Sequence, residues 1–235
     1  MMNRAIENTA VIVVAGGRSV RFGGGPPKTL ADLNGKSVLA RSLAAFCGRV
    51  AYAVVVTPEG LEAEMAAIAR TSVPDARVVT GGKRRQDSVE AGFRALDPSI
   101  RWVLVHDAAR PLVDSETVDA VLAATRRTGA AVPVLPVHAT VKTVDEEGMV
   151  VRTVPRQNLR LAQTPQGFRR DLLEEGFRAL AGCEDVFTDE AALLESIGVQ
   201  VMTVPGKTSN LKITTPEDLA WASAWLTATP SGGAS

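Results

Sequence analysis

The chain has 235 residues, of which 26 are basic and 26 are acidic, so its formal net charge at pH 7 is zero. This balance argues against a nucleic-acid coat protein and against a polybasic membrane binder. Hydrophobic residues make up 46% of the chain and charged residues 22%, a composition that argues against intrinsic disorder.

The length suits one α/β domain, which we place at residues 1–228, followed by a flexible tail over 229–235. With two cysteines only, Cys47 and Cys183, a disulfide framework and a four-thiolate zinc site are excluded, and we expect two buried free thiols. No apolar run approaches the roughly 18 residues of a membrane span. We therefore expect a cytoplasmic protein that binds neither nucleic acid nor a membrane.

Short β-branched runs alternate with segments of helical periodicity along most of the chain. The strand-like runs lie at 11–15, 50–57, 76–80, 102–106, 130–137 and 199–204. The clearest helical segments lie at 37–46, 61–69, 86–96 and 115–127. Because the strand-like runs lack polar alternation, we expect strands that are buried on both faces. The alternation predicts an α/β fold with a mostly parallel twisted sheet flanked by helices.

Residues 138–160 interrupt this alternation. Two short β-rich runs, 141–144 and 149–154, are joined by Asp-Glu-Glu-Gly, a sequence typical of a hairpin turn. Since a hairpin does not fit the α/β order, we place it outside the main sheet as a protruding β-arm. Exposed β-strands readily pair with another chain, so this arm is a candidate contact between subunits.

The first strand-like run leads into a long glycine-rich turn, AGGRSVRFGGGPPK at residues 15–28. It contains five glycines, two arginines and one lysine, and it has no acidic residue. Glycine lets backbone N–H groups approach an anion closely, and basic side chains neutralise its charge. Ligands of open α/β sheets bind outside the carboxyl ends of the strands, so this turn is a candidate phosphate-binding loop. Its spacing matches neither the dinucleotide-binding nor the Walker pattern.

A second segment, GGKRRQDS at residues 81–88, also follows a strand and precedes a helix. We expect Gly81 and Gly82 to permit the close approach of a ligand. Asp87 or Ser88 is a candidate cap for the following helix.

A third segment, HDAARP at residues 106–111, directly follows the strand-like run RWVLV. Asp107 stands at the carboxyl end of that strand, where its carboxylate is a candidate ligand for a divalent metal. His106 is expected to be a hydrogen-bonded structural histidine, and Arg110 follows Asp107 by three residues.

Basic residues cluster again at 151–170, which contains five arginines and no acid. Further on, TDEA at 188–191 is typical of a helix start, with Thr188 as the N-cap. Asn210 and Lys212 occupy alternate positions of a predicted short strand, which places them on one face. Thr215 is expected to cap the final helix.

The sequence has no His/Cys cluster for zinc and no G-x-S-x-G nucleophile motif. The polar groups that remain are basic side chains, glycine amides, hydroxyls and one or two acids. This set suits phosphoryl or nucleotidyl transfer, in which catalysis is mostly positioning and charge stabilisation.

Together these motifs resemble those of the 2-C-methyl-D-erythritol 4-phosphate cytidylyltransferase family of the non-mevalonate isoprenoid pathway. The matching stretches run in the family's order from about residue 9 to 227: AGGRSVRFGGGPPK, GGKRRQDSV, HDAARP, ATVKTV, TVPRQNLRLAQTPQGF, TDEA and NLKITTPEDL. The resemblance implies a Rossmann-like nucleotidyltransferase fold, a homodimer joined through the β-arm, Mg²⁺ or another divalent cation, and CTP as co-substrate. The implied reaction transfers CMP from CTP to methylerythritol phosphate and releases pyrophosphate.

The resemblance also implies roles for individual residues. It places the cytosine nucleotide against Ala15, Gly16, Gly17, Lys28, Gly82, Ser88, Asp107 and Ala108. It places methylerythritol phosphate among Arg110, Thr140, Arg156, Thr164, Thr188 and Lys212. The implied catalytic residues are Arg21, Lys28, Arg156 and Lys212, and the implied metal ligand is Asp107. Because Arg156 lies in the arm, it is expected to act on the site of the neighbouring subunit.

Four positions depart from the family pattern, namely Thr29, Ala139, Pro155 and Arg160. The last three lie in or beside the arm, so they concern contacts with the polyol phosphate more than CTP binding. The alternatives are a ribitol 5-phosphate cytidylyltransferase, another sugar-phosphate nucleotidyltransferase, and an inactive binding protein of the same fold. Alanine at position 109 favours the erythritol enzyme over the ribitol enzyme. An inactive protein is argued against by the joint presence of Arg21, Lys28, Asp107, Arg156 and Lys212.

Overall fold

The computed structural model describes residues 6, 8–16, 22, 27–180 and 186–229, and all structural statements below concern these residues. The sheet has eight strands: β1 (Thr9–Val14), β4 (Tyr52–Thr57), β5 (Arg77–Thr80), β6 (Trp102–Asp107), β7 (Ala130–Pro136), β10 (Arg160–Ala162), β11 (Gln166–Arg169) and β12 (Met202–Pro205). The helices are α2 (Val38–Ala44), α3 (Glu62–Ser72), α4 (Arg85–Arg94), α5 (Ser115–Thr128), α6 (Arg170–Ala179), α7 (Glu190–Ser196) and α8 (Pro216–Ala228).

The strand order is β10-β7-β11-β6-β1-β4-β5, with β12 paired to β7. The pairs β6–β1, β1–β4, β4–β5 and β12–β7 are parallel, as the alternation of strands and helices predicted. The short strands β10 and β11 were not predicted, and both pair antiparallel with their neighbours. They lie within the arginine-rich segment, where three or four residues carry too little pattern to indicate a strand.

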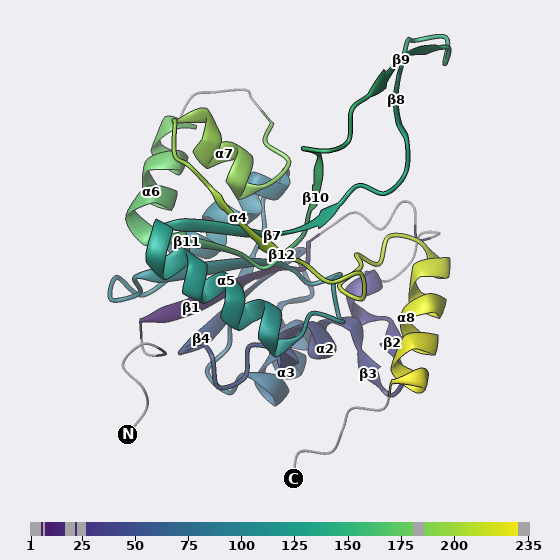
Figure 1. Cartoon of the computed structure of the whole chain (residues 1–235). Coiled ribbons are helices and arrows are strands. Elements are labelled where there is room, and N and C mark those ends of the chain that lie inside the picture. The colour runs from purple at the N-terminus through teal and green to yellow at the C-terminus, as the bar shows by residue number, and fades with distance from the viewer. Residues whose placement is uncertain (1–5, 7, 17–21, 23–26, 181–185, 230–235) are drawn as a thin grey trace.

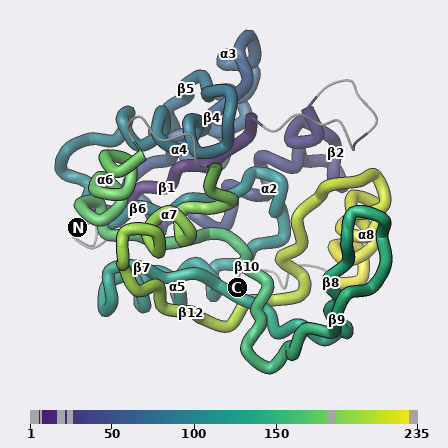
Figure 2. The backbone as a smooth tube through the Cα atoms, turned by 90° about the horizontal axis from the view of Figure 1, so that it is seen from above, coloured from purple at the N-terminus to yellow at the C-terminus, as the bar shows by residue number. Residues whose placement is uncertain are grey.

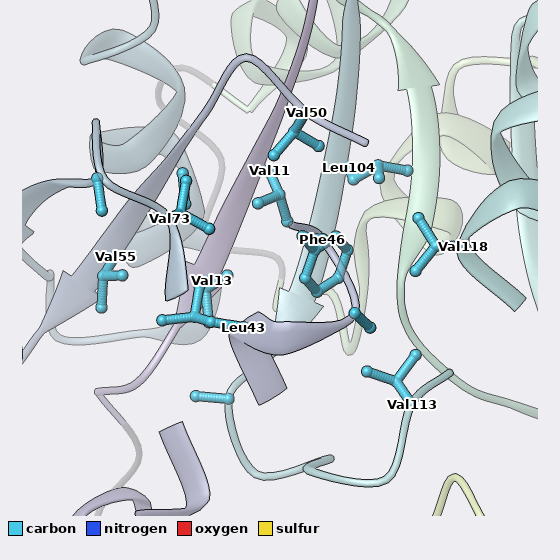
Figure 3. Close-up of a cluster of buried hydrophobic side chains, with 14 of the residues drawn as sticks. Val11, Val13, Leu43, Phe46, Val50, Val55, Val73, Leu104, Val113 and Val118 are labelled. Carbon is cyan, nitrogen blue, oxygen red and sulfur yellow. The ribbon is translucent and has the colours of Figure 1, made fainter. Parts of the chain in front are cut away.

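Helices cover both faces of the sheet (Figure 1). Along β1, Val11 and Val13 pack toward α2, α3 and α5, while Ala10 and Ile12 pack toward α4, α6 and α7. This alternation is the two-residue period of a strand, and it explains why the run is apolar throughout. Figure 3 shows the first of these two cores, in which Phe46 lies among valines and leucines from strands and helices.

Caps fix several helix starts. Thr215 and Asp218 form a capping box at α8, as predicted. The prediction that Thr188 caps α7 was wrong, because Asp189 is the cap and accepts a hydrogen bond from the Ala192 backbone N–H at 2.9 Å. Cys47 is exposed, so the expectation of a buried thiol was also wrong there, and Cys183 lies outside the described residues.

The predicted β-arm is present as a separate hairpin of β8 (Val141–Val144) and β9 (Val150–Val154). Figure 1 shows it projecting from the body, and both figures place it on the side of the molecule where α8 lies. Its apolar side chains are uncovered by the described part of the chain, with Met149 67% and Val151 63% exposed. Within the described residues, no helix combines the length and the apolar character that crossing a bilayer requires.

Gly167 offers a test of how tightly the unpredicted strand β11 packs on α5. A Cβ atom at this position would overlap Thr125 Oγ1 and lie 2.9 Å from Val121 Cγ1. We expect Gly167→Ala to lower the free energy of unfolding by about 1–3 kcal/mol, measured by urea denaturation. Adding Thr125→Ala removes the nearest atom and should recover part of the loss. An unchanged midpoint in Gly167→Ala would contradict this packing.

Candidate active site

Segments that follow β1, β5 and β6 meet at the carboxyl edge of the sheet and enclose a cavity of about 270 Å³. The lining residues are Val14, Ala15, Gly16, Pro27, Lys28, Thr29, Gly82, Lys83, Arg84, Arg85, Ser88, Asp107, Ala109 and Lys212. This set includes most residues that the sequence assigned to nucleotide binding. Ala108 is different, because it is fully buried with its N–H bonded to the Val14 carbonyl, and its neighbour Ala109 lines the cavity instead. Gly17 and Arg21 lie outside the described residues.

The loop at 81–88 is held by its own side chains. The Gly82 N–H donates to Ser88 Oγ at 3.1 Å, and the Arg84 N–H donates to Asp87 Oδ2 at 3.1 Å. A Cβ atom on Gly82 would overlap the Cβ of Asp87. Glycine is therefore required at position 82 for packing of the loop on the start of α4, and Gly82 also lines the cavity that the predicted ligand would enter.

A cluster of charges surrounds Asp107 at the end of β6. Lys212 Nζ lies 2.9 Å from Asp107 Oδ2, Arg110 Nε lies 3.7 Å from the same oxygen, and Arg85 Nε lies 3.4 Å from Oδ1. Burial by itself would raise the pKa of Asp107. The positive charges of Arg85, Lys212 and Arg110 outweigh burial and hold that pKa well below its usual range.

Arg85 also reaches a second buried carboxylate. Its Nη1 lies 2.7 Å from Glu190 Oε1 and 3.0 Å from Oε2, and the Glu190 side chain is only 3% exposed. Burial raises the pKa of Glu190, and the charge of Arg85 offsets part of that effect. Burial would lower the pKa of Arg85, but Glu190 and Asp107 together raise it, so the guanidinium stays charged.

A second cavity of about 250 Å³ lies on the other side of this cluster. Its lining residues are Arg85, Asp107, Arg110, Ala162, Gln163, Thr164, Gln166, Thr188, Asp189 and Lys212. Arg85, Asp107 and Lys212 therefore line both cavities. Four of the residues assigned to the polyol phosphate line it, namely Arg110, Thr164, Thr188 and Lys212. Thr140 and Arg156 do not, because both are exposed on the arm.

Hydrogen bonds through Thr164 connect the Asp107 backbone to the His106 side chain. The Asp107 backbone N–H donates to Thr164 Oγ1 at 3.0 Å, and His106 Nδ1 lies 3.0 Å from the same oxygen. His106 Nε2 lies 3.3 Å from the Arg110 carbonyl, which can only accept a hydrogen bond. The proton is therefore on Nε2, and the Thr164 hydroxyl donates to Nδ1. His106 is fully buried and structural, as the sequence analysis expected.

Asn210 and Lys212 reach the cluster from the segment before α8. The predicted strand is absent there, since residues 211–214 have no regular structure. Asn210 is instead held by hydrogen bonds: its Nδ2 donates to the Thr164 carbonyl at 2.9 Å, and its carbonyl accepts from Arg110 Nη1 at 2.8 Å. These hydrogen bonds bring Lys212 next to Asp107 without the backbone pairing of a β-strand.

Among the described residues that line the first cavity, Asp107 supplies the one carboxylate that could hold a divalent cation. Within the described residues, no group of three or more His, Cys, Asp or Glu side chains could hold a metal. Mg²⁺ is commonly bound through one or two carboxylates together with substrate phosphates. Asp107 therefore fits a cation that a bound triphosphate brings with it, and it does not form a metal site alone.

Sequence reasoning missed Arg85 and Glu190. Arg85 is one of three consecutive basic residues at 83–85, and spacing could not show which of them turns inward. Glu190 lies in TDEA, where helix capping already explained an acid at that position. The structure distinguishes the two acids of TDEA, because Asp189 caps α7 and Glu190 pairs with Arg85.

Two adjoining cavities lined by basic side chains, at the carboxyl edge of a helix-flanked and largely parallel sheet, fit the fold and the site of a nucleotidyltransferase. The model of the family described as IspD, 2-C-methyl-D-erythritol 4-phosphate cytidylyltransferase, matches residues 9–228, and the chain belongs to this family.

The relatives agree with the family match. A 2-C-methyl-D-erythritol 4-phosphate cytidylyltransferase of Frankia casuarinae is 46% identical over 226 residues, which cover 94% of this chain and 82% of that protein. A bifunctional IspD/IspF enzyme of Rhodopseudomonas palustris is 46% identical over 90% of this chain, which spans only 54% of its length. The chain thus spans about half of such bifunctional relatives.

Solved structures of the family share the fold. The 2-C-methyl-D-erythritol 4-phosphate cytidylyltransferase of Thermus thermophilus is 36% identical, with a TM-score of 0.78 over 94% of this chain and 99% of the other. A 4-diphosphocytidyl-2C-methyl-D-erythritol synthase of Anaerococcus prevotii is 28% identical, with a TM-score of 0.82 over the same shares. The chain is a cytidylyltransferase of isoprenoid biosynthesis that uses CTP, and the ribitol alternative is not favoured.

His106 makes the stability of the protein depend on pH. Burial lowers the pKa of His106 to about 3, so the folded protein leaves the imidazole neutral while the unfolded chain protonates it below about pH 6.5. Above about pH 6.5 the neutral His106 costs the folded protein no stability. As the pH falls from 6.5 toward 3, the unfolded chain gains a proton that the folded protein does not, so the free energy of unfolding falls. We expect the free energy of unfolding to be about 3 kcal/mol lower at pH 4 than at pH 7 because of this group.

The measurement is urea denaturation at pH 4 and pH 7 for the wild type and for His106→Gln, whose amide can replace the two hydrogen bonds. The variant should lose less stability on acidification than the wild type does. Equal losses in the two proteins would contradict the assignment to His106.

Proposed function

We propose that the cavity of about 270 Å³ binds CTP and that the cavity of about 250 Å³ binds methylerythritol phosphate. The observation that carries this proposal is that Arg85, Asp107 and Lys212 line both cavities, so two anionic substrates would meet at one charged boundary. Residues 1–228 act as one catalytic domain in the cytoplasm. The proposed partners are these two small molecules and a second subunit. We expect the protein to bind neither nucleic acid nor a membrane.

The reaction joins two phosphates. An oxygen of the methylerythritol phosphate attacks the α-phosphorus of CTP in line, a new P–O bond forms, and the bond to pyrophosphate breaks. A phosphate monoester has a second pKa near 6, so this nucleophile needs no general base at neutral pH. The main obstacle is charge, since two unit charges 4 Å apart repel by roughly 4 kcal/mol at an effective dielectric of 20.

Basic side chains offset this repulsion. Lys28 lines the nucleotide cavity and Lys212 lines both, so Lys28 is placed to stabilise charge on the triphosphate and Lys212 to hold the attacking phosphate. Arg110 lines the second cavity, where its carbonyl and guanidinium are already fixed by His106 and Asn210. Arg21, outside the described residues, is proposed to assist Lys28. A divalent cation held by Asp107 and the nucleotide would neutralise further charge on the triphosphate.

The arm is proposed to complete the site of a second subunit. Arg156 and Thr140 do not line the second cavity of their own chain, and the Arg156 guanidinium donates to the His138 carbonyl within the arm. The uncovered apolar side chains of the hairpin fit a surface that is buried between subunits, with Val144 57% and Val150 60% exposed. Homodimerisation through the arm would bring Arg156 to the partner's polyol phosphate.

The assignment of Lys28 predicts a selective loss of turnover. We expect Lys28→Ala to lower kcat about 100- to 1,000-fold, because it removes charge stabilisation from the transition state. The assay is pyrophosphate release with magnesium, CTP and methylerythritol phosphate, with thermal unfolding as a check of folding. Lys36→Ala, at an exposed lysine of β3 (Lys36–Ser37), is the matched control and should keep wild-type turnover.

Near wild-type turnover by Lys28→Ala would contradict its role. The same assay with ribitol 5-phosphate in place of methylerythritol phosphate tests the substrate. A preference for ribitol 5-phosphate would refute the assignment of the second cavity.

Mixed dimers test the proposal that Arg156 acts across the interface. Arg156→Ala should chiefly raise KM for methylerythritol phosphate. When equal amounts of Lys28→Ala and Arg156→Ala subunits are mixed at low substrate, action in trans leaves one complete site in each heterodimer. Random exchange then restores about a quarter of wild-type activity. If no activity returns although heterodimers form, Arg156 does not act in trans.

A further inference from the structure

Arg85 lines both cavities and contacts two carboxylates, those of Asp107 and Glu190. Its Nη1 donates to both oxygens of Glu190 at 2.7 and 3.0 Å, and its Nε and Nη2 each lie 3.4 Å from Asp107 Oδ1. The Arg85 side chain is 24% exposed, the Asp107 side chain 10% and the Glu190 side chain 3%. All three nitrogen atoms of this guanidinium thus contact a carboxylate, so Glu190 and Asp107 together set its position.

We propose that Arg85 and Glu190 form a positioning pair for the transfer reaction, in which Glu190 fixes Arg85 and Arg85 fixes Asp107 Oδ1. This inference rests on the proposed function of the two cavities. Asp107 then meets Lys212 through Oδ2 only, at 2.9 Å. An ammonium has three N–H donors, so Lys212 keeps donors for the attacking phosphate while its position is set by Asp107.

The pair also links the two substrate cavities mechanically. Arg85 is the first residue of α4 and follows the loop that lines the nucleotide cavity, and Glu190 is the first residue of α7. Thr188 and Asp189, directly before Glu190, line the second cavity. The ion pair therefore joins the start of α4 to the start of α7, and so joins the wall of one cavity to the wall of the other.

The start of α7 is also held by contacts that do not involve the Glu190 side chain. Gln166 Nε2 donates to Asp189 Oδ2 at 2.8 Å, and Gln166 Oε1 accepts from the Ala191 N–H at 3.2 Å. Gln86 Oε1 accepts from the Phe187 N–H at 2.9 Å. None of these hydrogen bonds involves the Glu190 side chain, so we expect them to hold the segment before α7 against β11 and α4 when Glu190 changes. A conservative variant is therefore informative.

The decisive variant is Glu190→Gln, which keeps length and one acceptor but removes the charge. We expect kcat to fall about tenfold or more, because a small misplacement of Asp107 and Lys212 lowers the rate strongly. KM for methylerythritol phosphate should rise at least about fivefold, while KM for CTP should stay within about threefold, since the nucleotide cavity keeps its other walls. A phosphate-binding Arg85 would do the opposite, because releasing it from Glu190 would tighten substrate binding and preserve kcat.

A double variant separates positioning from simple structural support. Arg85→Met leaves Glu190 buried and unpaired and should lower the thermal stability and kcat together. Arg85→Met/Glu190→Leu removes both charges and should recover the melting temperature to within a few degrees of wild type. We expect kcat of the double variant to stay at least about tenfold below wild type, because Asp107 Oδ1 still lacks its donor.

The matched control is Glu90→Gln with Arg94→Met, which removes an exposed ion pair from the same helix α4. It should leave kcat and both KM values unchanged. The inference is overturned if kcat of the double variant returns to wild type with stability, or if Glu190→Gln keeps wild-type kinetics. These outcomes differ from a failure of the proposed function, in which the wild-type enzyme itself would not turn over with CTP and methylerythritol phosphate.

Discussion

The buried carboxylate of Asp107 is the interaction on which the rest of the site depends. It stands at the end of the central strand β6, where it is contacted by Arg110, three residues further on, and by Arg85 and Lys212, which come from distant parts of the chain. Burying one charge is costly unless partners surround it, and removing one partner of a buried pair typically costs about 3–5 kcal/mol. Asp107 thus gathers three cations at one point, and its negative charge offsets the repulsion among them.

The zero net charge of the chain conceals this concentration. Basic residues are gathered in the glycine-rich turn, in residues 151–170 and before α8, while acids lie in the helix starts and the hairpin turn. Folding brings Lys28 and Lys212 from two of these segments to one edge of the sheet. Arg85 joins them there and is neutralised by Glu190, while the Lys212 side chain remains 43% exposed. Local charge, and not total charge, suits the cleft to anionic substrates.

Family membership and geometry contribute different parts of the account. The family match establishes the cytidyl transfer and its place in isoprenoid biosynthesis. The geometry adds which described residues line which cavity, and it shows that the arm residues Thr140 and Arg156 lie apart from the cavities of their own chain. A site that is proposed to need the arm of a second subunit would couple activity to dimerisation, since neither chain would hold every substrate contact.

The family resemblance of the motifs named about half of the residues that line the two cavities. By itself, the sequence determined the α/β order, the protruding arm and the cap of α8. Those features depend on local pattern, namely apolar runs, glycine-rich turns and capping residues that act within a few positions of one another. Only the tertiary structure decided the insertion of β11 between β6 and β7, the choice of Arg85 among three adjacent basic residues, and the pairing of Glu190. These depend on contacts between residues as far as 105 positions apart, as for Arg85 and Glu190. Burial and charge pairing over such separations leave no periodic trace in the sequence, so the fold had to bring the partners together before they could be recognised.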